Sequence, residues 1–243
     1  MKQNPARRVR NRGLSIEPLE GRQLLAGDVL AAIVDGSLII RGDRHSNDIL
    51  IRSVTEGGFI VEGRNQTTIN GSTQGFRIPG TAITRELDAM LGRGDDVVSI
   101  TGLRVNQAIR LDGGKGSDRF ELTDTTSLDL IMASSRGDDV VVMTNVTTTG
   151  NADLKLGKGN DNIAAPSWTV SGRLTIDGAR GDDTMVFGNL GVTNSAAIHT
   201  GRGRDQVAFI DDTKLPANTS IQMSRGDDTL VFNPGRGTGT ATL

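Results

Sequence analysis

Seven aspartates within residues 96–228 each lie two positions after a glycine and two positions before an apolar residue. Successive aspartates are separated by 21 to 23 positions, and they are Asp96, Asp118, Asp139, Asp161, Asp183, Asp205 and Asp228. The matching glycines are Gly94, Gly116, Gly137, Gly159, Gly181, Gly203 and Gly226. Carboxylate oxygens, with main-chain oxygens from a glycine turn, suit a hard cation such as Ca²⁺, which takes six or more oxygen ligands. The spacing places one such carboxylate in a glycine turn in each repeat.

The same loops carry a base three positions before each aspartate. These bases are Arg93, Lys115, Arg136, Lys158, Arg180, Arg202 and Arg225. A row of bases beside a row of carboxylates would neutralise the carboxylates and replace the metal. Two alternatives therefore stay open for the loops, a calcium site and a metal-free Arg/Lys–Asp ladder.

Apolar residues flank each loop at alternate positions. Two and four positions after the aspartate the sequence is almost entirely Val, Ile, Leu, Met or Phe, and a third apolar column lies seven positions before it. Alternation on both sides of a glycine turn is typical of strand, tight loop and strand. A unit of about 22 residues buries its apolar face only by stacking on identical units. We therefore predict an all-β fold, a parallel β-solenoid (β-helix or β-roll) with one Gly-Asp loop per coil.

The pattern divides the chain into four parts. We expect a basic sorting-like segment at residues 1–27, irregular capping coils at 28–86, a seven-coil solenoid at 87–233 and a flexible tail at 234–243. Within the capping part, strands are expected near residues 37–40 and 47–51 around a turn at 41–43. Asp48, 48 positions before Asp96, is interpreted as an earlier member of the aspartate series.

Composition excludes several classes of site. The 243 residues include no Cys, two His and only 3% aromatics, and the net charge is −2. The absence of Cys excludes a thiol nucleophile and a Cys-based metal centre. The chain after the basic residues 1–27 is acidic, so we expect no nucleic-acid-binding face on it. No apolar run is long enough for a transmembrane helix. A polysaccharide-active β-helix enzyme is a minor alternative, because aromatic platforms are scarce and the carboxylates follow the repeat. We expect no catalytic site.

The segment Gly113-Gly114-Lys115-Gly116-Ser117-Asp118-Arg119-Phe120-Glu121 resembles the RTX or haemolysin-type repeat, Gly-Gly-x-Gly-x-Asp-x-(apolar)-x. The other loops lack one or both leading glycines, and the matches span about residues 88–233. The resemblance implies Ca²⁺ bound between stacked turns by the seven aspartates and by main-chain oxygens of the seven glycines. Two features depart from the family: a single motif per coil of about 22 residues, and a base at the third motif position.

Residues 14–26, Leu-Ser-Ile-Glu-Pro-Leu-Glu-Gly-Arg-Gln-Leu-Leu-Ala, resemble the LEPR-XLL segment of exported planctomycete proteins. The resemblance implies a secreted or cell-surface protein; a short capping helix is the structural alternative. The expected partners are calcium ions and cell-envelope or matrix components, and end-to-end self-association is an open possibility at exposed terminal coils. The expected function is that of an exported, non-enzymatic, calcium-binding repeat protein. The alternative is a metal-free structural or adhesive surface solenoid.

Overall fold

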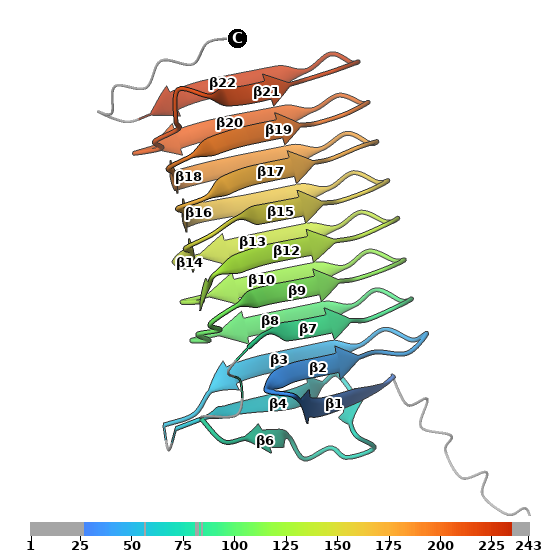
Figure 1. Ribbon diagram of the computed structural model, residues 1–243. Helices are drawn as coiled ribbons and strands as arrows, with labels where there is room; N and C mark the ends of the chain where they lie inside the picture. Colours follow the sequence, from blue (N-terminus) through green and yellow to red (C-terminus); the bar gives the residue numbers. More distant parts are fainter. Residues whose placement is uncertain (1–26, 56, 81–82, 84, 235–243) are drawn as a thin grey trace, which may run out of the picture.

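The computed structural model describes residues 27–55, 57–80, 83 and 85–234. Its described residues form a stack of coils, each with one strand in each of two facing sheets (Figure 1). Neighbouring coils pair in parallel and in register, so Phe120 lies between Val98 and Val141. The fold is a parallel β-solenoid of about seven regular turns, as the repeat predicts.

One sheet contains the strand that precedes each Gly-Asp turn. Its strands in the regular coils are β7 (Leu87–Met90), β9 (Ala108–Asp112), β12 (Asp129–Ala133), β15 (Ala152–Lys155), β17 (Arg173–Asp177), β19 (Ser195–His199) and β21 (Thr219–Gln222). The second sheet contains the strand that follows each turn. Its strands are β8 (Val97–Thr101), β10 (Arg119–Thr123), β13 (Val140–Thr144), β16 (Asn162–Val170), β18 (Thr184–Val192), β20 (Gln206–Asp211) and β22 (Thr229–Pro234). Two short strands, β11 (Thr126–Ser127) and β14 (Val146–Thr148), pair beside the far end of β16.

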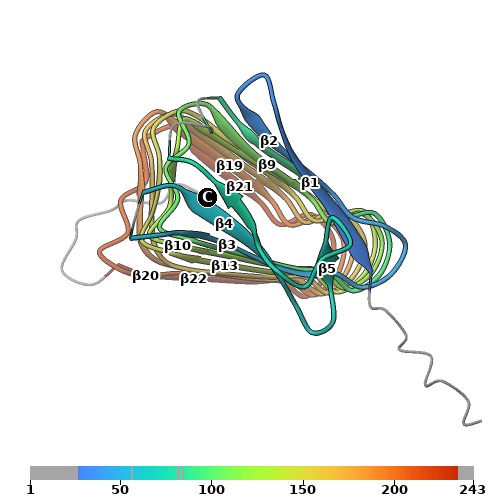
Figure 2. The same ribbon diagram turned by 90° about the horizontal axis from the view of Figure 1, so that it is seen from below.

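The N-terminal part continues the stack by one coil and then closes it. β2 (Ser37–Arg41) pairs in parallel with β7, and β3 (Asp48–Ser53) pairs in parallel with β8. Beyond them β1 (Asp28–Val34) is antiparallel to β2, and β4 (Phe59–Arg64) is antiparallel to β3. Short strands β5 (Thr68–Ile69) and β6 (Phe76–Ile78) end the two sheets, so this end is covered (Figure 2).

The core fills the space between the two sheets. The three apolar columns point inward, as the alternation predicts, and most of their side chains are less than 3% exposed. Phe187 and Phe209 stack with ring centroids 5.3 Å apart. In the last coil the inward residues Ile221, Met223, Leu230 and Phe232 are only partly buried, because no described coil lies above them.

Two predicted segments fall outside the described residues: 1–26, with nearly all of the sorting-like segment, and 235–243, with most of the predicted tail. β22 extends through Pro234, which pairs with Asp211. The described residues contain no helix, and therefore none of a length and hydropathy that could cross a membrane.

Candidate functional site

The turns between the two sheets stack in one column along the edge of the rod (Figure 1). The glycine two positions before each aspartate has a positive φ, from 117° at Gly94 to 152° at Gly226. A Cβ on Gly116 would overlap the carbonyl oxygen of Gly94 in the coil below, and a Cβ on Gly137 would overlap that of Gly116. Glycine is therefore required both by the backbone conformation and by the close approach of stacked turns. The carbonyl oxygens of these glycines lie against the next glycine in the column.

The seven aspartates point into the turns. Six of them, from Asp96 to Asp205, are at most 1% exposed, and Asp228 in the last coil is partly exposed. One carboxylate oxygen, Oδ1, accepts a hydrogen bond from the main-chain N–H of the corresponding aspartate in the preceding coil. These six N···O distances lie between 2.7 and 3.0 Å, as in Asp118 N–H to Asp139 Oδ1 at 2.7 Å. The aspartates thus form a continuous buried ladder.

The second carboxylate oxygen, Oδ2, is buried without a hydrogen-bond partner in the six aspartates from Asp96 to Asp205. Burial disfavours a bare carboxylate, since water is lost and no donor replaces it. It raises the pKa of Asp96, Asp118 and Asp161 to about 7, and that of Asp183 to about 8. Burial raises the pKa of Asp139 to about 6, and the hydrogen bond from the Asp118 N–H opposes that shift. These carboxyl groups need either a proton or a cation.

The residue five positions before each aspartate faces the carboxylate across the turn; we call this the inner position. A Cβ on Gly113 would overlap Asp118 Oδ2, and a Cβ on Gly178 would overlap Asp183 Oδ2. The inner positions are Leu91, Gly113, Ser134, Leu156, Gly178, Thr200 and Met223. Large side chains therefore recur at every third coil, with two small residues between them. Sequence reasoning missed this column, although its three-coil period is visible in the sequence.

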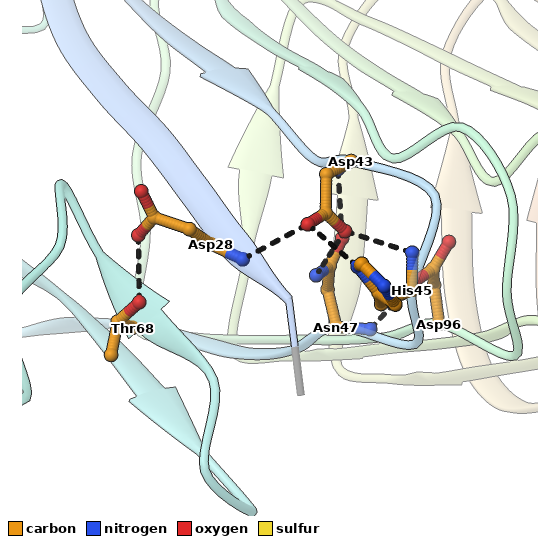
Figure 3. Close-up of polar contacts among 6 residues, drawn as sticks. All are labelled: Asp28, Asp43, His45, Asn47, Thr68 and Asp96. Atoms are coloured by element: carbon orange, nitrogen blue, oxygen red, sulfur yellow. Dashed lines mark hydrogen bonds and ion pairs between the residues drawn. The ribbon is translucent and has the colours of Figure 1, made fainter. Parts of the chain in front are cut away.

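The ladder begins at an asparagine. β3 starts at Asp48, which pairs with Val97, so the counterpart of Asp96 is Asn47 and not Asp48 as expected. The Asn47 N–H donates to Asp96 Oδ1 at 2.7 Å, and its side chain lies beside Asp43 (Figure 3). Asp43 also accepts from the N–H groups of Asp28 and His45. The missed signal is the base three positions earlier, Arg44, which has the same spacing from Asn47 as the base in every later turn.

The bases of the turns point outward. All seven are exposed, whereas the aspartates three positions later face inward. Among the described residues no ion pair joins a turn base to a ladder aspartate. The Arg/Lys–Asp ladder, one of the two alternatives left open by the sequence, is therefore not formed among the described residues, because the base is exposed and the aspartate is buried.

Scans against family models, curated proteins and solved structures returned no match to this chain. The arrangement must therefore be interpreted from its own geometry. No group of three or more Asp, Glu, His or Cys side chains that could hold a metal occurs in the part of the chain the structure describes. An ion at the ladder would take its side-chain ligands from neighbouring turns and the remainder from main-chain oxygens.

A second, outer ladder runs along the exposed side of the same turns. Residues directly before the aspartates accept a hydrogen bond from the main chain of the following coil, for example Asp95 Oδ1 from the Ser117 N–H at 2.8 Å. Asp138 Oδ1 accepts likewise from the Asn160 N–H at 2.7 Å. The ladder aspartates accept hydrogen bonds from the preceding coil, whereas the outer residues accept them from the following coil. Each turn is therefore hydrogen-bonded to both of its neighbours.

Proposed function

We propose that this chain is a non-enzymatic structural repeat protein of the cell exterior whose turns bind Ca²⁺. The observation that carries the proposal is the row of buried Oδ2 atoms without a hydrogen-bond partner. A buried carboxylate without a partner is costly, and a hard cation removes that cost while accepting oxygen ligands in flexible geometry. The resemblance of residues 113–121 to the RTX repeat supports the same choice of ion.

The inner positions suggest which turns hold the ions. Two pairs of adjacent turns have small inner residues, and they contain Asp118 with Asp139, and Asp183 with Asp205. Each pair offers two carboxylates and one hydroxyl, from Ser134 or Thr200. Leu91 and Leu156, at most 2% exposed, occupy the corresponding space beside Asp96 and Asp161. When bound, Ca²⁺ would supply the positive charge that two neighbouring carboxylates lack.

Export is the second part of the proposal. It is supported by the resemblance of residues 14–26 to the LEPR-XLL segment. Calcium is abundant outside cells, so a solenoid stabilised by Ca²⁺ would gain stability there through mass action.

A metal-free structural rod is the second candidate, and one observation favours it. Each ladder aspartate already joins two coils through Oδ1, with no ion involved. A protonated carboxyl group satisfies the burial requirement as well as a cation does, since the neutral form is the one that burial favours.

A calcium titration of the full chain separates the two candidates. We expect Ca²⁺ added after EGTA to raise the melting temperature, measured by far-UV circular dichroism, through linkage. Asp139→Asn keeps an acceptor oxygen but removes the charge, so it should stabilise the chelated protein and lose about half of the calcium response, the part that belongs to the Asp118–Asp139 pair.

The matched control is Asp138→Asn, because Asp138 is the adjacent residue and lies in the exposed outer ladder. This control should keep the calcium response of the wild type. An unchanged wild-type melt, or equal losses in both variants, would overturn calcium binding by the buried ladder and leave the metal-free rod.

A further inference from the structure

The outward bases form a continuous row along one edge of the rod. With Arg44 in the N-terminal coil there are eight turn bases: Arg44, Arg93, Lys115, Arg136, Lys158, Arg180, Arg202 and Arg225. The turns stack as parallel backbone, with bridges such as that from Arg93 to Lys115. Neighbouring parallel chains lie about 4.8 Å apart, so the bases repeat at about that interval. Few folds place so many cations in one straight line.

These cations are not neutralised within the chain. All eight side chains are exposed, and none of them takes part in an ion pair between described residues. The column directly before the aspartates adds four acids, Asp95, Asp138, Asp182 and Asp227, and one further base, Arg204. Asp43, directly before Arg44, is a fifth acid, so nine bases face five acids along this edge, although the whole chain has a net charge of −2. The positive charge is local to the edge.

A groove lies beside the row in three of its coils. Its floor is formed by Gly92, Gly114 and Ser135, and Arg93 and Lys115 line it, in a volume of about 300 Å³. Met90 and Asp112 form its other side, so a single acid is among its lining residues. The floor position is small in every later coil as well: Gly157, Ala179, Gly201 and Ser224. From the β7–β8 coil onwards a linear chain could therefore lie over a floor that carries no bulky side chain.

We propose that this edge, the eight-base row with its groove, binds a linear acidic polysaccharide. A polymer that carries one carboxylate or sulfate on each sugar presents its charges at intervals close to the rise of one coil. Charge complementarity then accumulates with every coil, although each exposed pair contributes little. The proposal does not depend on calcium binding, because the bases and the ladder carboxylates face different sides of the turn.

The groove favours a polysaccharide over a nucleic acid. Single-stranded nucleic acids are held by aromatic side chains on which bases stack, and no aromatic residue lines the groove. A duplex carries a phosphate about every 3.4 Å on each strand, which is denser than the row.

Isothermal titration of the full chain tests the proposal, in a buffer where circular dichroism shows it folded. The ligands are a short linear oligogalacturonate, a neutral maltooligosaccharide and a DNA duplex. We expect binding of the oligogalacturonate only, weakening as salt is raised. Replacing Arg93, Lys115 and Arg136 together by Gln should lower the affinity by about tenfold, because three exposed ion pairs are lost.

The control replaces Arg104, Arg173 and Lys214 together by Gln. These residues are also exposed, lie outside the row and carry the same total charge. The control should keep the wild-type affinity. Absence of binding by the wild type, equal losses in the two triple variants, or tighter binding of the duplex would each overturn the proposal.

Discussion

A buried carboxyl group in this protein has two different oxygens. Oδ1 of Asp139 accepts the N–H of Asp118 and so joins two coils, whereas Oδ2 has no partner in the described residues. Only one of the two oxygens, Oδ1, therefore takes part in the hydrogen bonds that join the coils. The oxygen without a partner decides how the protein responds to protons and cations, because burial raises the pKa of Asp139 and of Asp96, Asp118, Asp161 and Asp183.

The raised pKa values predict a pH dependence in EGTA. In the unfolded chain these five aspartates ionise near the ordinary pKa of 3.8, whereas in the folded protein they keep their protons up to about pH 6 to 8. Each stabilising proton is lost as pH rises through the folded pKa, so stability should fall by several kcal/mol from about pH 5 to about pH 8. Urea unfolding at a series of pH values measures this. A flat or rising curve would contradict it.

At the scale of the elements, the strand–turn–strand unit depends on its glycine. Gly137 has a φ of 129° and lies over the carbonyl group of Gly116, so an alanine there meets both backbone strain and a neighbouring coil. The small inner and floor residues have a different origin, since they leave space beside the carboxylate and beside the row of bases. Each turn thus contains a glycine that its backbone conformation requires, and small inner and floor residues that leave space beside the carboxylate and beside the row of bases.

We predict that Gly137→Ala destabilises the protein by about 2 kcal/mol or more, because the strain and the overlap add. Gly71→Ala is the control, since Gly71 also has a positive φ, of 72°, but a Cβ there would meet nothing within 4 Å. It should cost about 1 kcal/mol. Chemical denaturation compares the two variants, and equal costs would show that stacking of the turns does not require the glycine.

The sequence alone was sufficient to predict the repeat and to predict which side chains of each strand point into the core. Period-2 alternation around Asp118 is enough to assign Phe120 and Leu122 to the core, and both are 1% exposed. The sequence was insufficient at the N-terminal coil, where the segment with β4, β5 and β6 lies between β3 and β7 and hides the register, and where Asn47 replaces the aspartate. The sequence alone also could not predict that the Arg93 side chain points outward and the Asp96 side chain points inward, because these orientations depend on the φ angles of a tight turn and not on spacing.

At the scale of the whole molecule, each coil pairs only with the coils on either side. Stability is then close to a sum of coil and nearest-neighbour contributions. Asp139 and Asp161 occupy equivalent places 22 residues apart. The deletion of residues 140–161 therefore removes one complete coil and lets Asp139 take the place of Asp161.

We expect this deletion variant to fold, with a β-type circular dichroism spectrum and a cooperative melt at somewhat lower temperature. Deleting residues 140–150 alone is the control, because it removes β13 and β14 and joins β12 to β15, two strands of the same sheet, so that the second sheet loses a strand in the middle of the stack. The control should not fold. Failure of the whole-coil deletion to fold would show that the coils are not independent units.

The covered N-terminal end has a consequence for how the protein is made. The residues of the cap and of the β2–β3 coil leave the ribosome before those of any later coil. Once the cap and the β2–β3 coil have formed, β2 and β3 each have one edge free for pairing, and β7 and β8 can pair with these edges as they emerge. Each later coil then pairs with the coil formed before it. Translation then proceeds in the same direction as assembly, and the slow search for distant strand partners that delays many β proteins is confined to the first coil.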